Sequence, residues 1–114
     1  MNILKIQILQ FNVERGNVDK NMQNIKTKFN QYLDKDTSVV VLPEMWNNGY
    51  ALEELEQKAD KNLKDSSLFI KDLAHTFNVD IIAGSVSNIR ENHIYNTAFA
   101  INKNCLLYTS DAAD

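Results

Sequence analysis

The chain has 114 residues, of which 44% are hydrophobic and 24% are charged, with three Gly, one Pro and one Cys. This length and composition are typical of one globular domain or part of one, and they exclude a disordered or collagen-like chain. The net charge of -3 and the scattered lysines argue against a nucleic-acid or anionic-membrane partner, since such surfaces need clustered Lys and Arg.

The single cysteine, Cys105, cannot form an internal disulfide, and no Cys or His cluster has the spacing of metal ligands. We therefore expect no metal and no other cofactor. The first apolar stretch, residues 3–11, is too short and too polar for a signal-peptide core or a membrane span. The sequence accordingly predicts a cytoplasmic protein without a membrane partner.

The first half of the chain predicts a strand, a helix and a second strand. Residues 3–11 (ILKIQILQF) predict a strand, and Asn17 is a suitable N-cap for the helix that follows. The apolar side chains of that helix, which spans roughly 15 residues, recur at helical spacing: Met22, Ile25, Phe29, Tyr32 and Leu33. Residues 38–42 (SVVVL) predict a strand that is covered on both faces, as in parallel sheets, so the two strands should lie side by side.

The second half predicts two helices and two further strands. A short helix is expected over residues 52–59, and a longer one after a cap at Ser66, with Asn78 in a left-handed conformation at its end. The apolar face of the longer helix is Phe69, Ile70, Leu73, Ala74 and Phe77. Strands are expected over 79–85 and 94–101, antiparallel because the polar stretch between them is too short for a crossover. Gly84 is interpreted as a close backbone approach.

The segment PEMWNNGY places a carboxylate and two aromatic rings at a strand end. Pro43 ends the buried strand at its carboxyl end, where open α/β sheets bind ligands. Glu44 follows directly, and the rings of Trp46 and Tyr50 are expected to shield it from water, which suits a carboxyl to general-base work. The residues alone leave an alternative open, in which Glu44 is a solvated loop glutamate and the aromatics serve the core.

Four segments, in order along most of the chain, resemble the nitrilase superfamily, the carbon-nitrogen hydrolases. The opening ILKIQILQFNVERGNVDKNMQNI is similar to the first strand and helix of that family, with Gln10, Gly16 and Asn21 or Asn24 at positions of its pattern. LPEMWNNGY resembles its catalytic-glutamate motif, IIAGSV its next strand, and YNTAFAINKN the strand that leads toward its catalytic lysine. The wording WNNGYALEEL is most similar to small bacterial omega-amidase-like members, which hydrolyse amides of 2-oxo dicarboxylic acids.

The resemblance implies an amidase with a Glu-Lys-Cys site and a small-molecule amide substrate. Glu44 would be the general base, a lysine would stabilise the oxyanion, and a cysteine would attack the carbonyl carbon to form a thioester. Trp46 and Tyr50 would line or support the substrate pocket, and Asn96 would brace the loops around it. The resemblance implies no cofactor, and a homo-oligomer for the full-length parent.

The sequence departs from the family pattern toward its end. No lysine follows Lys103, no cysteine matches the nucleophile, and Cys105 stands where the family usually has glycine. The family domain is a four-layer αββα sandwich roughly twice this length. We therefore interpret residues 1–104 as its N-terminal portion, a partial carbon-nitrogen hydrolase domain, and 105–114 as an atypical tail that resembles a translated adapter. Such a truncated chain is expected to be inactive.

A second hypothesis is a non-catalytic α/β interaction module of flavodoxin-like or receiver-like type, because such domains also alternate strands and helices at this length. The two hypotheses differ in how the sheet is covered. A receiver-like domain buries both faces of its own sheet, whereas a fragment of the sandwich leaves one face of Ile and Val side chains bare.

Overall fold

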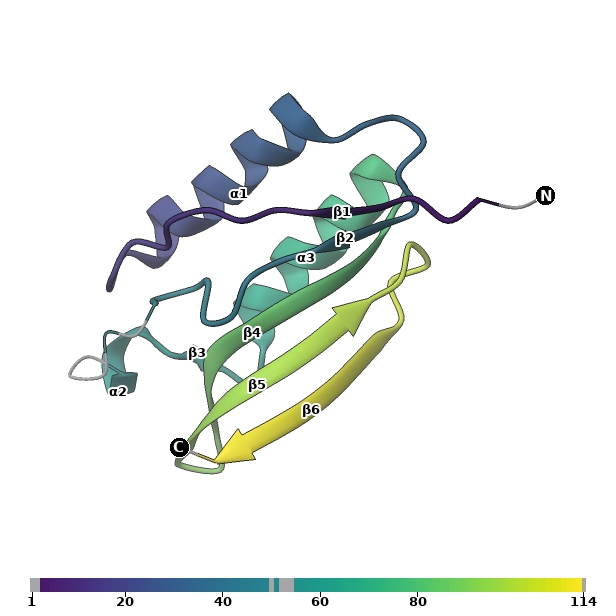
Figure 1. The fold of residues 1–114 in the computed structure, drawn as a ribbon. Helices are drawn as coiled ribbons and strands as arrows, with labels where there is room; N and C mark the ends of the chain where they lie inside the picture. Colours follow the sequence, from purple (N-terminus) through teal and green to yellow (C-terminus); the bar gives the residue numbers. More distant parts are fainter. Residues whose placement is uncertain (1–2, 50, 52–54, 114) are drawn as a thin grey trace.

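The computed structural model describes residues 3–49, 51 and 55–113, and it shows a layer of helices on a mixed β-sheet (Figure 1). The strands are β1 (Ile6–Ile8), β2 (Val39–Val41), β3 (Asp60–Lys61), β4 (Asp80–Arg90), β5 (His93–Ile101) and β6 (Leu107–Ala113). The helices are α1 (Val18–Tyr32), α2 (Leu55–Lys58) and α3 (Lys64–Phe77). The helix expected over 52–59 corresponds to α2, and residues 52–54 lie outside the described residues.

The sheet confirms the predicted strand pairing. Its strands lie in the order β1-β2-β4-β5-β6, with the short β3 beside β4. β1, β2 and β4 run parallel, and Val40 of β2 pairs with Gln7 on one side and Ile81 on the other. β4, β5 and β6 run antiparallel. The parallel half therefore brings the carboxyl ends of β1 and β2 side by side, while β4 continues past them to Arg90.

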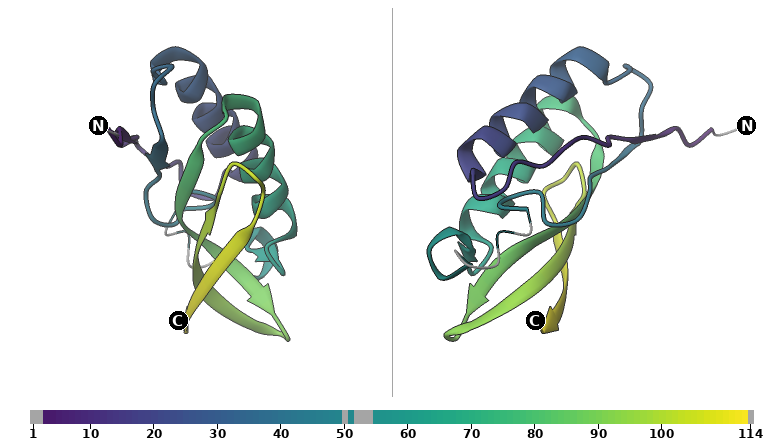
Figure 2. Two further views of the ribbon diagram at one scale, coloured as in Figure 1. Left: turned by 90° about the vertical axis from the view of Figure 1, so that its right-hand side faces the viewer. Right: turned by 60° about the vertical axis from the view of Figure 1, so that its left-hand side comes forward.

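Both long helices lie on the same face of the sheet (Figure 2). Phe29 of α1 and Phe77 of α3 are in ring contact, with their centroids 5.4 Å apart. Alternate residues of the central strands, such as Val40 and Ile81, are buried in the same hydrophobic cluster as Ile25 and Ile70 of the helices. The apolar stripes that the sequence predicts on α1 and α3 therefore form one core with one face of the sheet.

The opposite face of the sheet is open. Ile6, Ile8 and Ile82 are 53%, 66% and 50% exposed. The register places Ile8 beside Val41 and Val41 beside Ile82, so these side chains form a row across the parallel strands. Within the described residues no helix covers this row, as expected for part of a sandwich and unlike a receiver-like domain.

The ends of α1 are fixed by polar side chains. Asn17 Oδ1 accepts a hydrogen bond from the backbone N–H of Lys20 at 3.1 Å, so the predicted N-cap is confirmed. At the other end, Gln7 of β1 donates from Nε2 to the carbonyl oxygen of Tyr32, and its Oε1 accepts from the backbone N–H of Asp34. Gln7 therefore joins the helix end to the first strand.

The predicted cap of α3 is wrong. The helix begins at Lys64, two residues before Ser66, after Leu63 in a left-handed conformation with φ 55°. The carboxylate of Asp60 in β3 accepts from the backbone N–H groups of Asp65 at 3.2 Å and Ser66 at 2.7 Å. A side chain from the preceding strand thus satisfies donors that we expected a local cap to satisfy. The predicted left-handed residue at the other end, Asn78, is confirmed, with φ 53°.

The connection between β4 and β5 is shorter than predicted. β4 continues to Arg90 and β5 begins at His93, so the turn consists of Glu91 and Asn92, with φ 52° and 65°. Two residues with positive φ are the requirement of a type I′ hairpin turn. The polar residues Ser87 and Asn88, which suggested a loop, lie in β4 and are buried with hydrogen-bond partners.

Residues 107–113 form the edge strand β6, which pairs antiparallel with β5. Asp111 links this strand to the hairpin, since its carboxylate accepts from Arg90 Nη2 and from Thr97 Oγ1, both at 2.6 Å. The foreign origin of residues 105–114 stays a prediction, and sequencing the source DNA and transcript through the codon of Asn104 tests it.

Candidate functional site

Glu44 lies three residues after the end of β2, at the carboxyl end of that strand and beside β4, which continues to Arg90. Leu42 N donates to the carbonyl oxygen of Ile82 in β4 at 2.9 Å, and Pro43, which has no backbone N–H, follows it. The Glu44 side chain is exposed. The structure therefore places this carboxylate at the strand end where ligands bind in open α/β sheets.

Gly84 allows β2 and β4 to stay in contact at this exit. A β-carbon on residue 84 would lie 2.6 Å from the carbonyl oxygen of Leu42, closer than real β-carbons approach backbone atoms. Its φ of 59° is also a conformation that L side chains rarely adopt. The interpretation of Gly84 as a close backbone approach is confirmed.

Backbone hydrogen bonds attach the turn after Glu44 to β4. Met45 N donates to Ser85 Oγ at 3.0 Å, and Trp46 N donates to the carbonyl oxygen of Ser85 at 3.2 Å. Gly49 N closes the turn by donating to the carbonyl oxygen of Met45 at 2.8 Å. Met45 itself has φ 53°, a strained conformation for a residue with a side chain.

The Trp46 ring belongs to the core. It is fully buried, its Nε1 donates to the carbonyl oxygen of Ala83 at 2.6 Å, and it is in ring contact with Phe69 of α3. Since Glu44 is exposed, the described residues do not shield it from water as we expected. Tyr50, the second aromatic residue of the prediction, lies outside the described residues.

Asn47 makes a contact that the sequence analysis missed. Its carboxamide pairs with the main chain of Ser87 in β4: Nδ2 donates to the carbonyl oxygen, and Oδ1 accepts from the N–H, both at 3.0 Å. The carbonyl oxygen of Asn47 accepts from Nδ2 of the buried Asn21 in α1 at 2.9 Å. The adjacent asparagines Asn47 and Asn48 within the glutamate motif are a signal for this arrangement, since buried carboxamides must find partners.

Asn96 and Asn48 lie on either side of Ser87. Asn96 of β5 is the cross-strand partner of Ser87, and Asn48 Oδ1 accepts from Ser87 Oγ at 3.0 Å. Within the described residues, neither Asn96 Oδ1 nor Asn48 Nδ2 has a hydrogen-bond partner, although both atoms are buried. The bracing role of Asn96 stays a prediction, but its position beside the turn is compatible with it.

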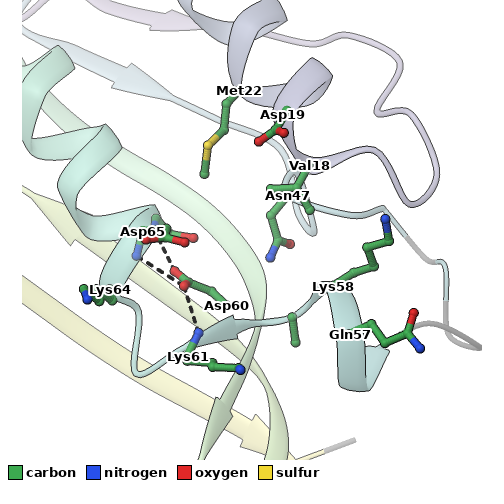
Figure 3. Close-up of a pocket in the computed structure, with 12 residues that line it drawn as sticks. Val18, Asp19, Met22, Asn47, Gln57, Lys58, Asp60, Lys61, Lys64 and Asp65 are labelled. Atoms are coloured by element: carbon green, nitrogen blue, oxygen red, sulfur yellow. Dashed lines mark hydrogen bonds between the residues drawn. The ribbon is translucent and has the colours of Figure 1, made fainter.

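A hollow of about 510 Å³ lies near the N-terminal ends of α1 and α3 (Figure 3). Its charged lining is balanced, with three lysines and three aspartates: Lys58, Lys61, Lys64, Asp19, Asp60 and Asp65. Asn47 reaches it, but Glu44, Trp46 and Asn96 do not line it. One of its carboxylates, that of Asp60, is already bonded to the first turn of α3. The predicted site residues therefore do not converge on this hollow.

Two further findings concern only the described residues. No cluster of three or more His, Cys, Asp or Glu side chains is arranged to hold a metal ion. None of the helices in residues 3–49 and 55–113 has the length and hydropathy needed to cross a membrane.

Comparison with known proteins places this arrangement in a family. Residues 5–110 match the carbon-nitrogen hydrolase family. A Staphylococcus aureus protein named "Hydrolase in agr operon" is 54% identical over 100 residues, which are 88% of this chain and 38% of that protein. A 2-oxoglutaramate amidase of Bacillus subtilis is 33% identical over 98 residues, 86% of this chain and 38% of the enzyme. The chain thus spans little more than a third of these relatives.

Solved structures agree with this assignment at the level of the fold. A CN-hydrolase superfamily protein of Xanthomonas campestris superposes with a TM-score of 0.87 at 22% identity, over 97% of this chain and 41% of its own. Nit3 of Saccharomyces cerevisiae, a nitrilase superfamily member, superposes with a TM-score of 0.79 at 23% identity, over 97% of this chain and 44% of its own. The sequence match over residues 5–110 shows that this chain belongs to the carbon-nitrogen hydrolase family, and the solved structures show that it shares their fold.

Proposed function

We propose that the protein containing these residues hydrolyses the carbon-nitrogen bond of a small amide, with Glu44 as general base. The observation that carries the proposal is the position of Glu44: a carboxylate at the carboxyl end of β2, on a turn bonded to β4, in a chain of this hydrolase family. The relative named 2-oxoglutaramate amidase supports an omega-amide of a 2-oxo dicarboxylic acid as the substrate.

In the proposed reaction Glu44 takes the proton of a cysteine thiol, and the thiolate attacks the amide carbon. A lysine ammonium stabilises the oxyanion of the tetrahedral intermediate. Glu44 then gives this proton to the amide nitrogen, so that ammonia leaves as the thioester forms. In the second half of the reaction Glu44 takes a proton from water, whose oxygen attacks the thioester carbon, and the carboxylic acid is released as the cysteine sulfur takes the proton back from Glu44. In this proposal the cysteine and the lysine come from outside these 114 residues, which span 38% of the length of each of the two relatives.

The polar atoms around Ser87 support a site that further groups complete. Asn48 Nδ2 is a buried donor and Asn96 Oδ1 a buried acceptor, and neither has a partner within the described residues. An unpaired buried polar group costs about 1–3 kcal/mol. Groups from outside the described residues would remove this cost if they bonded to both atoms. Such groups would then lie next to the turn that carries Glu44.

The test uses the full-length protein, meaning the product of the whole reading frame that contains these residues. Ammonia release from 2-oxoglutaramate is measured for the natural protein and for Glu44→Gln. We expect the substitution to lower kcat by about a hundredfold or more, the range of general-base contributions. Glu91→Gln, which changes an exposed glutamate in the β4–β5 turn, is the matched control and should keep full activity. A Glu44→Gln variant with undiminished turnover would exclude Glu44 as the base.

We also propose that the 114-residue chain alone releases no ammonia above background. A base without its nucleophile and oxyanion lysine is an incomplete catalytic set, and loss of such members typically removes orders of magnitude of rate. Turnover by the purified chain that disappears in Glu44→Gln would show instead that these residues suffice.

A cytoplasmic location is part of the proposal. It is supported by the single cysteine, which suits a reducing compartment. Fractionation of cells that express the full-length protein, with detection by antibody, tests the location.

A further inference from the structure

We propose that Asn47 is a positioning residue for Glu44: its carboxamide pairs with the main chain of Ser87 and so fixes the turn that carries Glu44, beyond the end of β2, against β4. This inference rests on the proposed function, because it assigns a role to Asn47 in the action of Glu44. It concerns a side chain that neither the motif nor the fold comparison assigns.

The contact between Asn47 and Ser87 resembles the pairing of two strands. A strand neighbour would offer one N–H donor and one carbonyl acceptor, and the carboxamide of Asn47 offers the same two groups. Asn47 Nδ2 also lies 3.2 Å from Ser87 Oγ. Both residues are buried, with 1% and 0% of their surface exposed. Removal of the carboxamide would leave the N–H and carbonyl groups of Ser87 without this partner in a buried place.

Asn47 is itself held from the other side by α1. Asn21 Nδ2 donates to the carbonyl oxygen of Asn47, and also to that of Glu14 at 2.7 Å. Asn21 Oδ1 accepts from the backbone N–H of Glu14 at 2.7 Å. The buried carboxamides of Asn21 and Asn47 therefore connect α1 to β4. Their hydrogen bonds hold both the side chain and the main chain of Asn47.

The turn needs this support because of its backbone. Met45 has φ 53°, and non-glycine residues keep such conformations only where the surrounding structure holds them. Ser85 holds the turn at Met45 and Trp46, and Ser87 holds it at Asn47. Without the Asn47 carboxamide, the turn would keep its bonds to Ala83 and Ser85 and the bond from Ser87 Oγ to Asn48, but it would lose both bonds to the main chain of Ser87. Glu44 precedes this strained residue directly, so a change in the turn would move its carboxylate.

Asn47→Asp in the full-length protein separates the roles of the two carboxamide atoms. The carboxylate keeps the acceptor for Ser87 N–H but places a second oxygen against the carbonyl oxygen of Ser87. Protonation of the introduced carboxyl restores a donor, so the variant has its own pH-dependent rescue. At pH 7 we expect kcat to fall at least tenfold and KM to change less than threefold. As the pH is lowered, the kcat of the variant should rise again relative to the kcat of the natural protein at the same pH. Asn102→Asp is the matched control, since Asn102 Oδ1 accepts from the backbone N–H groups of Asn104 and Leu106, and an aspartate keeps this acceptor.

Amide hydrogen exchange of residues 43–49, followed by mass spectrometry, gives a readout that does not depend on turnover. We expect exchange in this segment to be at least tenfold faster in Asn47→Asp than in the natural protein and in Asn102→Asp. Unchanged kcat across the pH range, or unchanged exchange at residues 43–49, would overturn the inference. If Asn47→Asp does not fold, Asn21→Asp replaces it, because this change removes the donor to the Asn47 carbonyl oxygen. A kcat and an exchange rate at residues 43–49 equal to those of the natural protein would again overturn the inference.

The outcomes separate the two proposals. An inactive natural protein, or an active Glu44→Gln variant, would refute the proposed function, and hydrogen exchange would then decide whether Asn47 fixes the turn. An active natural protein with an inactive Glu44→Gln variant and a fully active Asn47→Asp variant would refute only the positioning role.

Discussion

Gly84 of β4 lies so close to Pro43 that a β-carbon on residue 84 would be 2.0 Å from the Pro43 carbonyl oxygen. The backbone at Leu42 and Pro43, which leads to Glu44, therefore lies so close to β4 that only a hydrogen atom fits on the α-carbon of residue 84. This contact links the glycine of the IIAGSV segment to the glutamate motif, although the two segments are separated by about 40 residues in the chain. The position of Glu44 thus depends on a residue that takes no part in chemistry.

Gly84→Ala is expected to destabilise the full-length protein by at least about 2 kcal/mol, because the methyl group meets backbone atoms that cannot move aside and the positive φ adds strain. Urea unfolding measures the change in the free energy of unfolding. Since the chain must separate from β4 to admit the methyl group, activity should fall as well.

Gly49→Ala is the matched control. Gly49 has φ 62°, close to that of Gly84, but its nearest neighbour for a β-carbon is Val13 Cγ1 at an ordinary 3.5 Å. The expected loss is about 1–2 kcal/mol, from backbone strain alone. Equal losses for the two variants would mean that the close contact with Pro43 adds nothing to the cost of the strained backbone.

The open face of the sheet predicts that the 114-residue chain associates. Ile8 and Ile82 are among the large exposed apolar side chains, and they belong to one row across the parallel strands. Large exposed apolar patches drive self-association. Light scattering after size-exclusion chromatography should show aggregates for the natural chain, and a shift toward monomer for Ile8→Lys/Ile82→Lys.

Leu68→Lys is the control for this prediction, because Leu68 is 58% exposed but lies on α3, away from the row. It should leave the association unchanged. A monodisperse natural chain with a sharp two-state melt would contradict the prediction and would favour a self-sufficient interaction module.

The sequence predicted the elements whose signals are local or periodic. The N-cap of α1 at Asn17 and the left-handed Asn78 after α3 depend on neighbouring residues, and the sequence located both. The start of α3 and the extent of β4 depend on distant partners. Asp60 reaches α3 from β3, and Ser87 is buried in β4 through its pairing with Asn47, so polarity alone suggested a cap and a loop in the wrong places.

The sequence predicted where Glu44 lies in the fold, but not which side chains surround it. The strand end, Pro43 and the family motif located Glu44 in the sequence, and the structure places it at the carboxyl end of β2. The surroundings depend on where each turn side chain points: the ring of Trp46 lies in the core, and the carboxamide of Asn47 bonds to Ser87. The side chains of neighbouring residues in an irregular turn point in different directions. These directions follow no periodic pattern, so they cannot be predicted from the sequence as those of a helix or a strand can.

Asp60→Ala should destabilise α3 in the full-length protein by about 0.5–2 kcal/mol, the cost of losing a side chain that caps a helix N-terminus. The reason is that the Asp60 carboxylate accepts from the backbone N–H groups of Asp65 and Ser66, and the residue before the helix makes no side-chain cap bond. Urea unfolding measures the loss. Asp72→Ala, an exposed change in the middle of α3, should cost much less, and equal losses would contradict the capping role.

An ion-pair cluster at the start of the chain predicts a small pH-dependent contribution to stability. Lys5 Nζ lies 2.8 Å from Asp34 Oδ2 and 2.9 Å from Asp36 Oδ1. The hydrogen bonds that Lys5 donates to Asp34 and, second in effect, to Asp36 raise the pKa of Lys5 above 10.5, and the hydrogen bond that Asp36 accepts from Lys5 lowers the pKa of Asp36 below 3.8. The contribution of Asp36 is therefore present above pH 3.8 and lost as the pH falls through its folded-state pKa, whereas that of Lys5 is lost only as the pH rises above 10.5.

A double-mutant cycle with Lys5→Gln and Asp36→Asn isolates this contribution. Urea unfolding of the four full-length proteins should give a favourable coupling energy at pH 7 that shrinks with added salt, because the groups are exposed and solvent ions screen them. The coupling should also vanish once the pH is below the folded-state pKa of Asp36, since a neutral carboxyl no longer attracts the ammonium group. A coupling energy that persists in acid and in high salt would show that Lys5 and Asp36 interact through packing instead of charge.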